Sequence, residues 1–242
     1  MRFRCLAIFA ALVLWILPAA AADGAQSRAI GYSRDGKYFA FEQYGIEDGS
    51  GFPYWEVFVL DLAANDWVKG TPVRVQLQDE EARLPEARKQ AMAKAGPVLK
   101  QLAIDEPADL LLANPFTEAV PDRTRVRFGI FHNTMEPPYE LSVETVDLPA
   151  PSECSDPDFK PTGMMVRLRV LTTGKELTIA RDDKIPKSRQ CPLRYDIEAV
   201  YTPSGYGSPA PQVALIGVYS RGFEGEDRRF IALPFELPSF EK

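Results

Sequence analysis

The chain has 242 residues, of which 45% are hydrophobic, and its 28 basic and 34 acidic residues give a net charge of −6. A chain of this length can bury a substantial core as one large domain or two small ones. It contains no run of basic residues, so its charge gives no indication of binding to nucleic acid or to an anionic lipid surface.

The first 22 residues have the pattern of a secretory signal peptide. Arg2 and Arg4 form a positive start, an apolar run covers residues 5–17, and Ala20-Ala21-Ala22 offers a cleavage site. The alternative is an uncleaved anchor, but the apolar run is shorter than the roughly 20 residues that a membrane-spanning helix needs. We therefore expect cleavage near Ala22, and a periplasmic or secreted mature chain with no membrane span.

Residues 28–75 have the turn signals and apolar runs of an antiparallel β-meander. Asp35-Gly36 lies at a tight turn between two such runs. Aromatic side chains gather in this region, which predicts the core of a sheet, with a binding platform for glycans or peptide side chains as the alternative. If a platform exists, Tyr54 and Trp55, just after a glycine-rich loop, are the candidates for exposed ligand contacts.

The glycine-rich loop itself, residues 45–53, carries two carboxylates. Glu47 and Asp48 could bind calcium together with backbone carbonyls, because Ca²⁺ prefers oxygen ligands on flexible loops. Their spacing does not match an EF-hand, and a solvated turn is the simpler interpretation.

Residues 79–104 change to the periodicity of a helix. Apolar residues recur every three or four positions, as in Ala87, Ala91 and Ala95, which predicts an amphipathic helix. Pro97 lacks the backbone N–H that a helix interior needs, so we expect a break or kink there.

The rest of the chain returns to short β-like runs separated by turn signals. The expected strands cover residues 125–131, 139–146, 164–170, 176–180, 195–201, 213–219 and 229–234. The pattern predicts a mainly β (α+β) fold, in which antiparallel meanders form a sandwich or partial-propeller-like domain with one kinked helix. We expect a single domain over 23–242, with sub-lobes 28–75 and 123–236 joined by the helical segment.

Two cysteines remain after the leader is removed. Cys154 and Cys191 form an even pair in an oxidising compartment, which predicts a disulfide between two loops. A redox-active pair is the alternative, but the C-x-x-C spacing that lowers a thiol pKa is missing.

The sequence offers few residues for catalysis. His132 is the single histidine, and the chain shows neither the ligand spacing of a zinc site nor the nucleophile elbow of a hydrolase. No dinucleotide fingerprint or phosphate loop appears, so we expect no cofactor. Glu224 and Asp227 are the one candidate acid pair, and the neighbouring Phe223 could stack on a ligand.

Several motifs resemble known families. The segment Ser33-Arg34-Asp35-Gly36-Lys37, with the apolar-Asp-apolar step at residues 60–62, resembles one blade of a TolB-type β-propeller. Residues 35–41, 185–192 and 222–225 resemble a family of predicted secreted bacterial proteins, domain of unknown function 2259. The second resemblance spans most of the mature chain and implies secretion, and it carries over no catalytic residue.

Three functional interpretations follow from these features. The first is a non-catalytic periplasmic or secreted module that binds an envelope ligand or protein. The second is a carboxylate-dependent envelope hydrolase that uses Glu224 and Asp227, and the third is a structural scaffold. An exposed aromatic patch would favour the first, and two acids facing each other in a cleft would favour the second.

Overall fold

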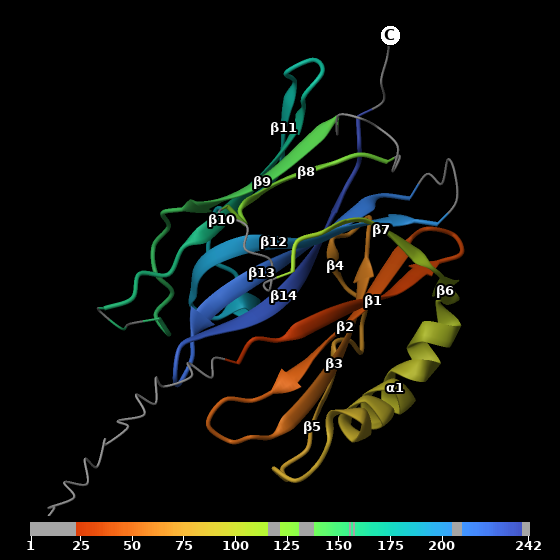
Figure 1. The fold of residues 1–242 in the computed structure, drawn as a ribbon, viewed down its shortest axis with the longest axis vertical. Helices are drawn as coiled ribbons and strands as arrows, with labels where there is room; N and C mark the ends of the chain where they lie inside the picture. Colours follow the sequence, from red (N-terminus) through yellow and green to blue (C-terminus); the bar gives the residue numbers. More distant parts are fainter. Residues whose placement is uncertain are drawn as a thin grey trace, which may run out of the picture.

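The structure is a computed structural model that describes residues 23–115, 122–130, 138–154, 156, 158–204 and 210–238. The leader and His132 lie outside these residues. The described residues form three antiparallel sheets, one α-helix and one short 3₁₀ helix (Figure 1). The predicted mainly β, sandwich-like fold is confirmed.

The sheet next to the helix, here called the helix-side sheet, contains the N-terminal strands. Four of them form a meander in the order β4-β3-β2-β1, while β6 pairs with β1 and β5 pairs with β3. Its strands are β1 (Gln26–Ser33), β2 (Tyr38–Ile46), β3 (Pro53–Asp61), β4 (Asp66–Trp67), β5 (Val73–Gln76) and β6 (Ile104–Glu106).

The second half of the chain forms the other two sheets. The central sheet has the order β14-β13-β12-β7, and the outer sheet has the order β11-β10-β9-β8. The central strands are β7 (Ala108–Ala113), β12 (Pro192–Pro203), β13 (Gln212–Arg221) and β14 (Glu226–Phe235). The outer strands are β8 (Arg125–Phe128), β9 (Tyr139–Val146), β10 (Gly163–Val170) and β11 (Glu176–Arg181).

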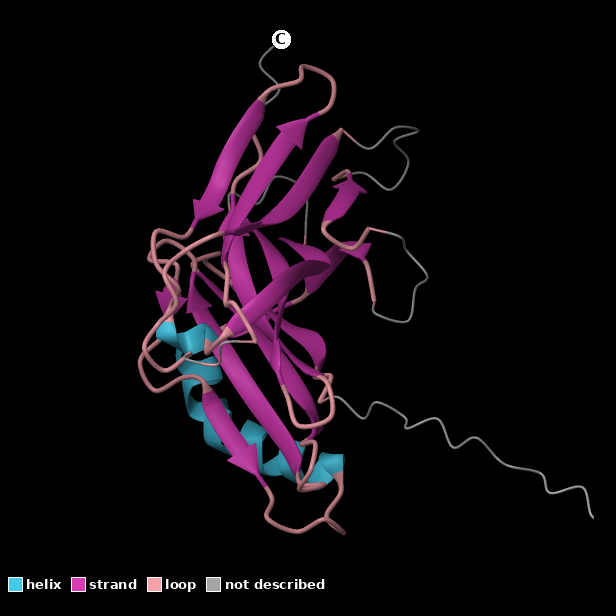
Figure 2. Ribbon diagram, turned by 90° about the vertical axis from the view of Figure 1, so that its left-hand side faces the viewer, coloured by secondary structure: helices cyan, strands magenta, loops and turns pink. Residues whose placement is uncertain are grey.

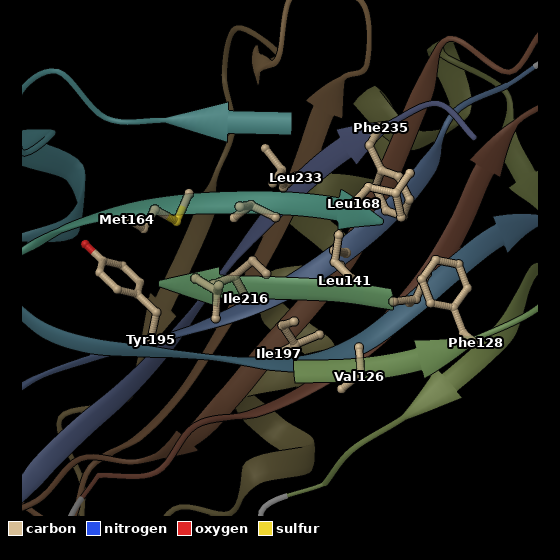
Figure 3. Close-up of a cluster of buried hydrophobic side chains, with 14 of the residues drawn as sticks. Val126, Phe128, Leu141, Met164, Leu168, Tyr195, Ile197, Ile216, Leu233 and Phe235 are labelled. Atoms are coloured by element: carbon tan, nitrogen blue, oxygen red, sulfur yellow. The ribbon is translucent and has the colours of Figure 1, made fainter. Parts of the chain in front are cut away.

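The central sheet is buried on both faces. Along β13, Val213 and Leu215 pack against the helix-side sheet, while Ala214 and Ile216 pack against the outer sheet. Because side chains alternate along a strand, this apolar run supplies two separate cores. Figure 3 shows the core between the central and outer sheets, where Ile216 and Ile197 face Leu141 and Leu168.

The helix α1 (Leu84–Gln101) covers the free face of the helix-side sheet (Figures 1 and 2). Its buried side chains are Ala87, Ala91, Ala95 and Leu99, so the predicted amphipathic stripe is confirmed with Leu99 as its last member. The helix continues for one further turn after Pro97, so the expected break does not occur.

The turn between β1 and β2 is built by its own side chains. The Ser33 hydroxyl donates to the Asp35 carboxylate at 2.7 Å and accepts from the backbone N–H groups of Lys37 and Tyr38. Gly36 has φ of 69°, a left-handed conformation that costs glycine little. The Asp-Gly signal therefore produces the predicted turn.

The Ser33 hydrogen bond, followed by that from Lys37, lowers the pKa of Asp35 to about 2. We expect an NMR titration of the Asp35 carboxyl to show this midpoint, because the bond stabilises the charged form. In Ser33→Ala the midpoint is expected to rise toward the ordinary aspartate value of about 3.9. An unchanged midpoint in Ser33→Ala would show that the hydroxyl is not responsible.

Candidate functional site

A polar pocket lies between the helix-side sheet and the central sheet. It has a volume of about 370 Å³, and a second pocket of about 350 Å³ adjoins it and shares Glu56, Arg74 and Arg229. We call the two together the cationic groove. Its charged lining residues are Glu47, Glu56, Arg74, Lys187, Arg189 and Arg229.

The floor of the groove comes from the two sheets. Phe58 of β3 and Phe230 of β14 are almost fully buried, and Trp67 of β4 is half-buried beside them. The backbone N–H of Phe230 donates to the side-chain oxygen of Gln43 at 2.8 Å, which joins the two sheets beneath the groove. A buried aromatic floor under a charged rim can hold a ligand that has both an apolar and a charged part.

Two of the groove arginines are oriented by acids. The Arg74 Nε donates to the Glu56 carboxylate at 2.6 Å, and one Arg229 terminal nitrogen lies 2.5 Å from the Asp23 carboxylate. The Arg229 guanidinium also stacks on the Tyr54 ring at 4.7 Å. These contacts fix where the guanidinium groups lie, and the Arg74 side chain still exposes 65% of its surface.

The opposite wall is the 3₁₀ helix η1 (Lys187–Arg189) together with Gln190. The Arg189 guanidinium donates to the Asp182 carboxylate at 2.5 Å, and that carboxylate also accepts the Met164 N–H at 2.7 Å. Lys187 and Ser188 are exposed, and their side chains form no hydrogen bond or ion pair with another described residue. Their polar atoms are therefore available to a ligand.

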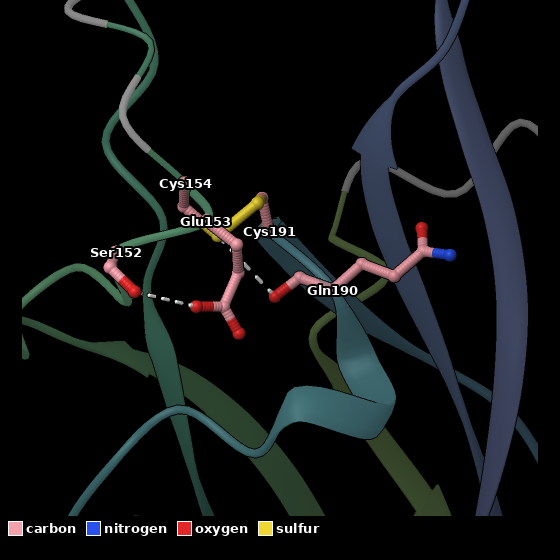
Figure 4. Close-up of a disulfide and its surroundings, with 5 residues drawn as sticks. All are labelled: Ser152, Glu153, Cys154, Gln190 and Cys191. Carbon is pink, nitrogen blue, oxygen red and sulfur yellow. Dashed lines mark hydrogen bonds between the residues drawn. A yellow bond between two sulfur atoms is a disulfide. The ribbon is translucent and has the colours of Figure 1, made fainter.

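The disulfide anchors this wall. Cys154 and Cys191 are bonded, with Cα atoms 5.6 Å apart, so the predicted pairing is confirmed (Figure 4). Gln190, which directly precedes Cys191, has φ of 57°, a region that residues other than glycine seldom occupy. The disulfide and this unusual backbone conformation therefore lie next to each other at the groove wall.

The expected exposure of Tyr54 and Trp55 is wrong, because each side chain exposes only 6% of its surface. Tyr54 faces the central sheet and donates its hydroxyl to Asp23 at 2.8 Å. Trp55 faces the helix and stacks on Tyr44 with ring centroids 4.0 Å apart. Strand β3 is covered on both faces, so aromatic residues on either side of it belong to the cores.

The hairpin between β13 and β14 carries the other candidates. Phe223 is 80% exposed, and the Glu224 N–H donates to the Asp48 carboxylate at 2.9 Å. Burial, followed by the negative charges of Asp23 and Asp48, raises the pKa of Asp227, against the lowering effect of Arg229. Asp227 accepts the Asp23 N–H at 3.3 Å, and neither Glu224 nor Asp227 lines the cationic groove.

The calcium candidates also make contacts between loops. The Glu47 carboxylate accepts hydrogen bonds from Ser50, at 2.8 Å, and from Gln76, while Asp48 binds the hairpin. Within the described residues, no group of three or more histidine, cysteine or acidic side chains is placed to hold a metal ion.

The positively charged residues of the groove were not predicted from the sequence as a site. Lys187, Arg189 and Gln190 lie in the segment 185–192, which carries the family resemblance and includes Cys191. The closeness of Lys187 and Arg189 to Cys191 in the sequence could have indicated this wall of the site. Arg74 and Arg229 come from separate strands, and their approach depends on the packing of the two sheets.

A family model described as "Predicted secreted protein (DUF2259)" matches residues 40–236. The chain belongs to this family. The match covers every residue of the groove, and it confirms the family resemblance found in the sequence. No curated protein and no solved structure matches the chain. In the described part of the chain, no helix has the length and apolar character that a membrane crossing requires.

Proposed function

We propose that this DUF2259 protein is a non-catalytic binding module of the periplasm or cell exterior, and that its cationic groove holds an acidic ligand. The observation that carries the proposal is the charge of the larger pocket. Four cationic side chains, Arg74, Lys187, Arg189 and Arg229, line it in a protein whose net charge is −6. Each arginine is paired with an acid, Glu56, Asp182 or Asp23, so Lys187 and the 65% exposed Arg74 are the cations open to a ligand.

The exposed cations Arg74 and Lys187 favour carboxylate or phosphate groups. Guanidinium groups donate paired hydrogen bonds to such anions, and a recess with low-dielectric walls strengthens the local potential. Lys187 and Ser188 add donors on the η1 side, while the half-buried Trp67 offers an apolar surface. An acidic sugar or an acidic peptide has this combination of charge and apolar surface.

Among the sequence-based candidates, the ligand-contact candidate Tyr54 and the calcium candidate Glu47 lie at the groove, and Phe223 takes a separate role. Tyr54 and Glu47 line the smaller pocket, where the edge of the Tyr54 ring would limit the length of a ligand. Phe223 projects from the β13–β14 hairpin and would contact a protein partner, since an exposed aromatic at a loop tip is a common anchor.

The test is a calorimetric titration of residues 23–242 with phosphate, citrate, glucuronate and a glutamate-rich peptide. We expect saturable binding of at least one probe, weakened about tenfold or more in Arg74→Gln/Lys187→Gln, because a hydrogen bond to a charged group contributes about 1.5–3 kcal/mol. The matched control is Lys175→Gln, an exposed lysine in the β10–β11 turn.

Equal affinity of the double variant and the control would place binding outside the groove. Turnover of a probe, abolished by Glu224→Gln, would instead favour the carboxylate hydrolase. No binding of any of the four probes by a cooperatively folded protein would contradict an anion site and favour the scaffold.

A further inference from the structure

Asp23, which follows the cleavage motif, is held by several hydrogen bonds. Asp23 is 3% exposed, and its N–H donates to the Asp227 carboxylate at 3.3 Å. Its own carboxylate accepts from the Tyr54 hydroxyl at 2.8 Å and from Arg229 at 2.5 Å. Its carbonyl accepts from the Arg228 N–H at 2.9 Å and from Arg229 at 3.1 Å.

The next two residues extend this attachment along β14, the edge strand of the central sheet. Gly24 forms a parallel bridge with Arg228, and the Ala25 N–H donates to the Arg228 carbonyl at 3.1 Å. The Arg228 side chain returns a hydrogen bond to the Ala25 carbonyl at 2.9 Å. Since β1 begins at Gln26 in the helix-side sheet, residues 23–25 tie two sheets together.

Asp227, which accepts the Asp23 N–H, lies among charges of both signs. Three carboxylates, those of Asp23, Asp48 and Asp227, interact here, and Arg229 is the cation that acts on Asp227. Asp227 is also partly buried, which makes its negative charge costly unless a cation compensates it. One more positive charge at the position of the Asp23 nitrogen would supply that compensation.

Proteolytic processing can create that charge at this atom. The cleavage motif Ala20-Ala21-Ala22 ends directly before Asp23. Hydrolysis of the Ala22–Asp23 bond breaks the C–N bond, leaves the water oxygen on the Ala22 carboxylate, and gives Asp23 a free amine. An α-amine has an ordinary pKa of about 7.7–8.0, so it takes up a proton near neutral pH and becomes an ammonium.

We propose that signal peptidase cleaves between Ala22 and Asp23, and that the new α-ammonium of Asp23 forms an ion pair with Asp227 that completes the fold. The mature N-terminus is then an internal structural element. Because Asp23 is buried between β14 and Tyr54, cleavage precedes the docking of this segment. The ion pair also fixes Asp23, which orients Arg229, and its formation does not depend on which ligand the groove takes.

The first test is the N-terminus of the exported protein, determined by intact mass and N-terminal sequencing after expression with its own leader. We expect the mature chain to begin at Asp23. A mature chain that begins at any other residue would overturn the proposal, because the α-ammonium would then lie elsewhere.

The second test is a thermal melting cycle with four proteins, made from fusions whose protease leaves no extra residue. Residues 23–242 are compared with residues 21–242, each with and without Asp227→Asn. We expect 21–242 to melt about 2–4 °C lower. Asp227→Asn is expected to lower the melting temperature of 23–242 by a similar amount, and that of 21–242 by a clearly smaller amount.

The matched control is Glu236→Gln, an exposed acid just after β14, which we expect to leave both melting temperatures unchanged. If Asp227 serves only as an acceptor for a backbone N–H, Asp227→Asn will lower the melting temperature of both chains by the same amount. That result, or equal melting of 21–242 and 23–242, would overturn the ion pair.

Discussion

Asp196→Ala is expected to lower the free energy of unfolding by about 3–5 kcal/mol, the cost of leaving the partner of a buried ion pair uncompensated. Asp196 is 1% exposed in the central strand β12. One of its carboxylate oxygens accepts from the Arg123 Nε at 2.8 Å and from the Tyr219 hydroxyl at 2.7 Å. Native domains are stable by only about 5–15 kcal/mol, so this loss is a large share of the total.

The neighbouring residues explain why this site tolerates little change. Arg123 also donates to Glu198 at 3.1 Å, but that carboxylate lies 3.6 Å from Arg228 as well, so it is shared between two cations and replaces the Asp196 charge only in part. A Cβ added at Gly217 would lie 2.2 Å from the other Asp196 oxygen, which is why glycine occupies this position of β13.

Urea unfolding at neutral pH measures the effect. Tyr219→Phe should cost less, about 1–3 kcal/mol, since it removes one hydrogen bond and leaves the ion pair. The control is Asp183→Ala, an exposed acid, which should stay within about 0.5 kcal/mol of the parent. A loss below about 1 kcal/mol in Asp196→Ala would show that the network does not stabilise the fold.

Removing the disulfide is the second large change. In Cys154→Ser/Cys191→Ser we expect a loss of about 3–4 kcal/mol, because the bond closes a 37-residue separation and restricts the unfolded chain. We also expect weaker binding of any groove probe, since Cys191 holds the η1 wall. Urea unfolding with and without reductant, followed by titration of the folded variant, measures both effects.

The parent without reductant should unfold at a higher urea concentration than the double variant. Adding reductant should not change the urea concentration at which the double variant unfolds. If the oxidised parent and the double variant unfold at the same urea concentration, the disulfide does not stabilise the chain. Unchanged probe affinity in the folded variant would show that η1 keeps its position without the covalent link.

Local sequence patterns predicted most of the described strands well. The expected strand at 139–146 coincides with β9, and the alternation of Phe39 and Phe41 against Ala40 does place them in different cores. The Leu110–Leu112 run is not among the expected strands, but it lies in β7, whose partner β12 is about 90 residues further along the chain. The positions of proline and glycine mark local turns, so they could not predict a pairing between strands that are so far apart in the sequence.

The candidate site was much harder to predict than the strands. Tyr54 and Trp55 follow a glycine-rich loop, which suggested exposure, yet the helix and the central sheet cover both faces of β3. The cationic groove joins residues from β3, β5, η1 and β14, and only the packing of two sheets brings them together. A pair such as Arg229 and Asp23 is separated by 206 residues, beyond the reach of any local pattern.

The most direct test of the proposed function is a crystal structure of residues 23–242 with the tightest-binding acidic probe. The proposal predicts the anionic group of the probe in the groove, within hydrogen-bonding distance of Arg74 and of Lys187 or Ser188. A probe bound at another surface, or a groove that stays empty when calorimetry shows saturation, would contradict it.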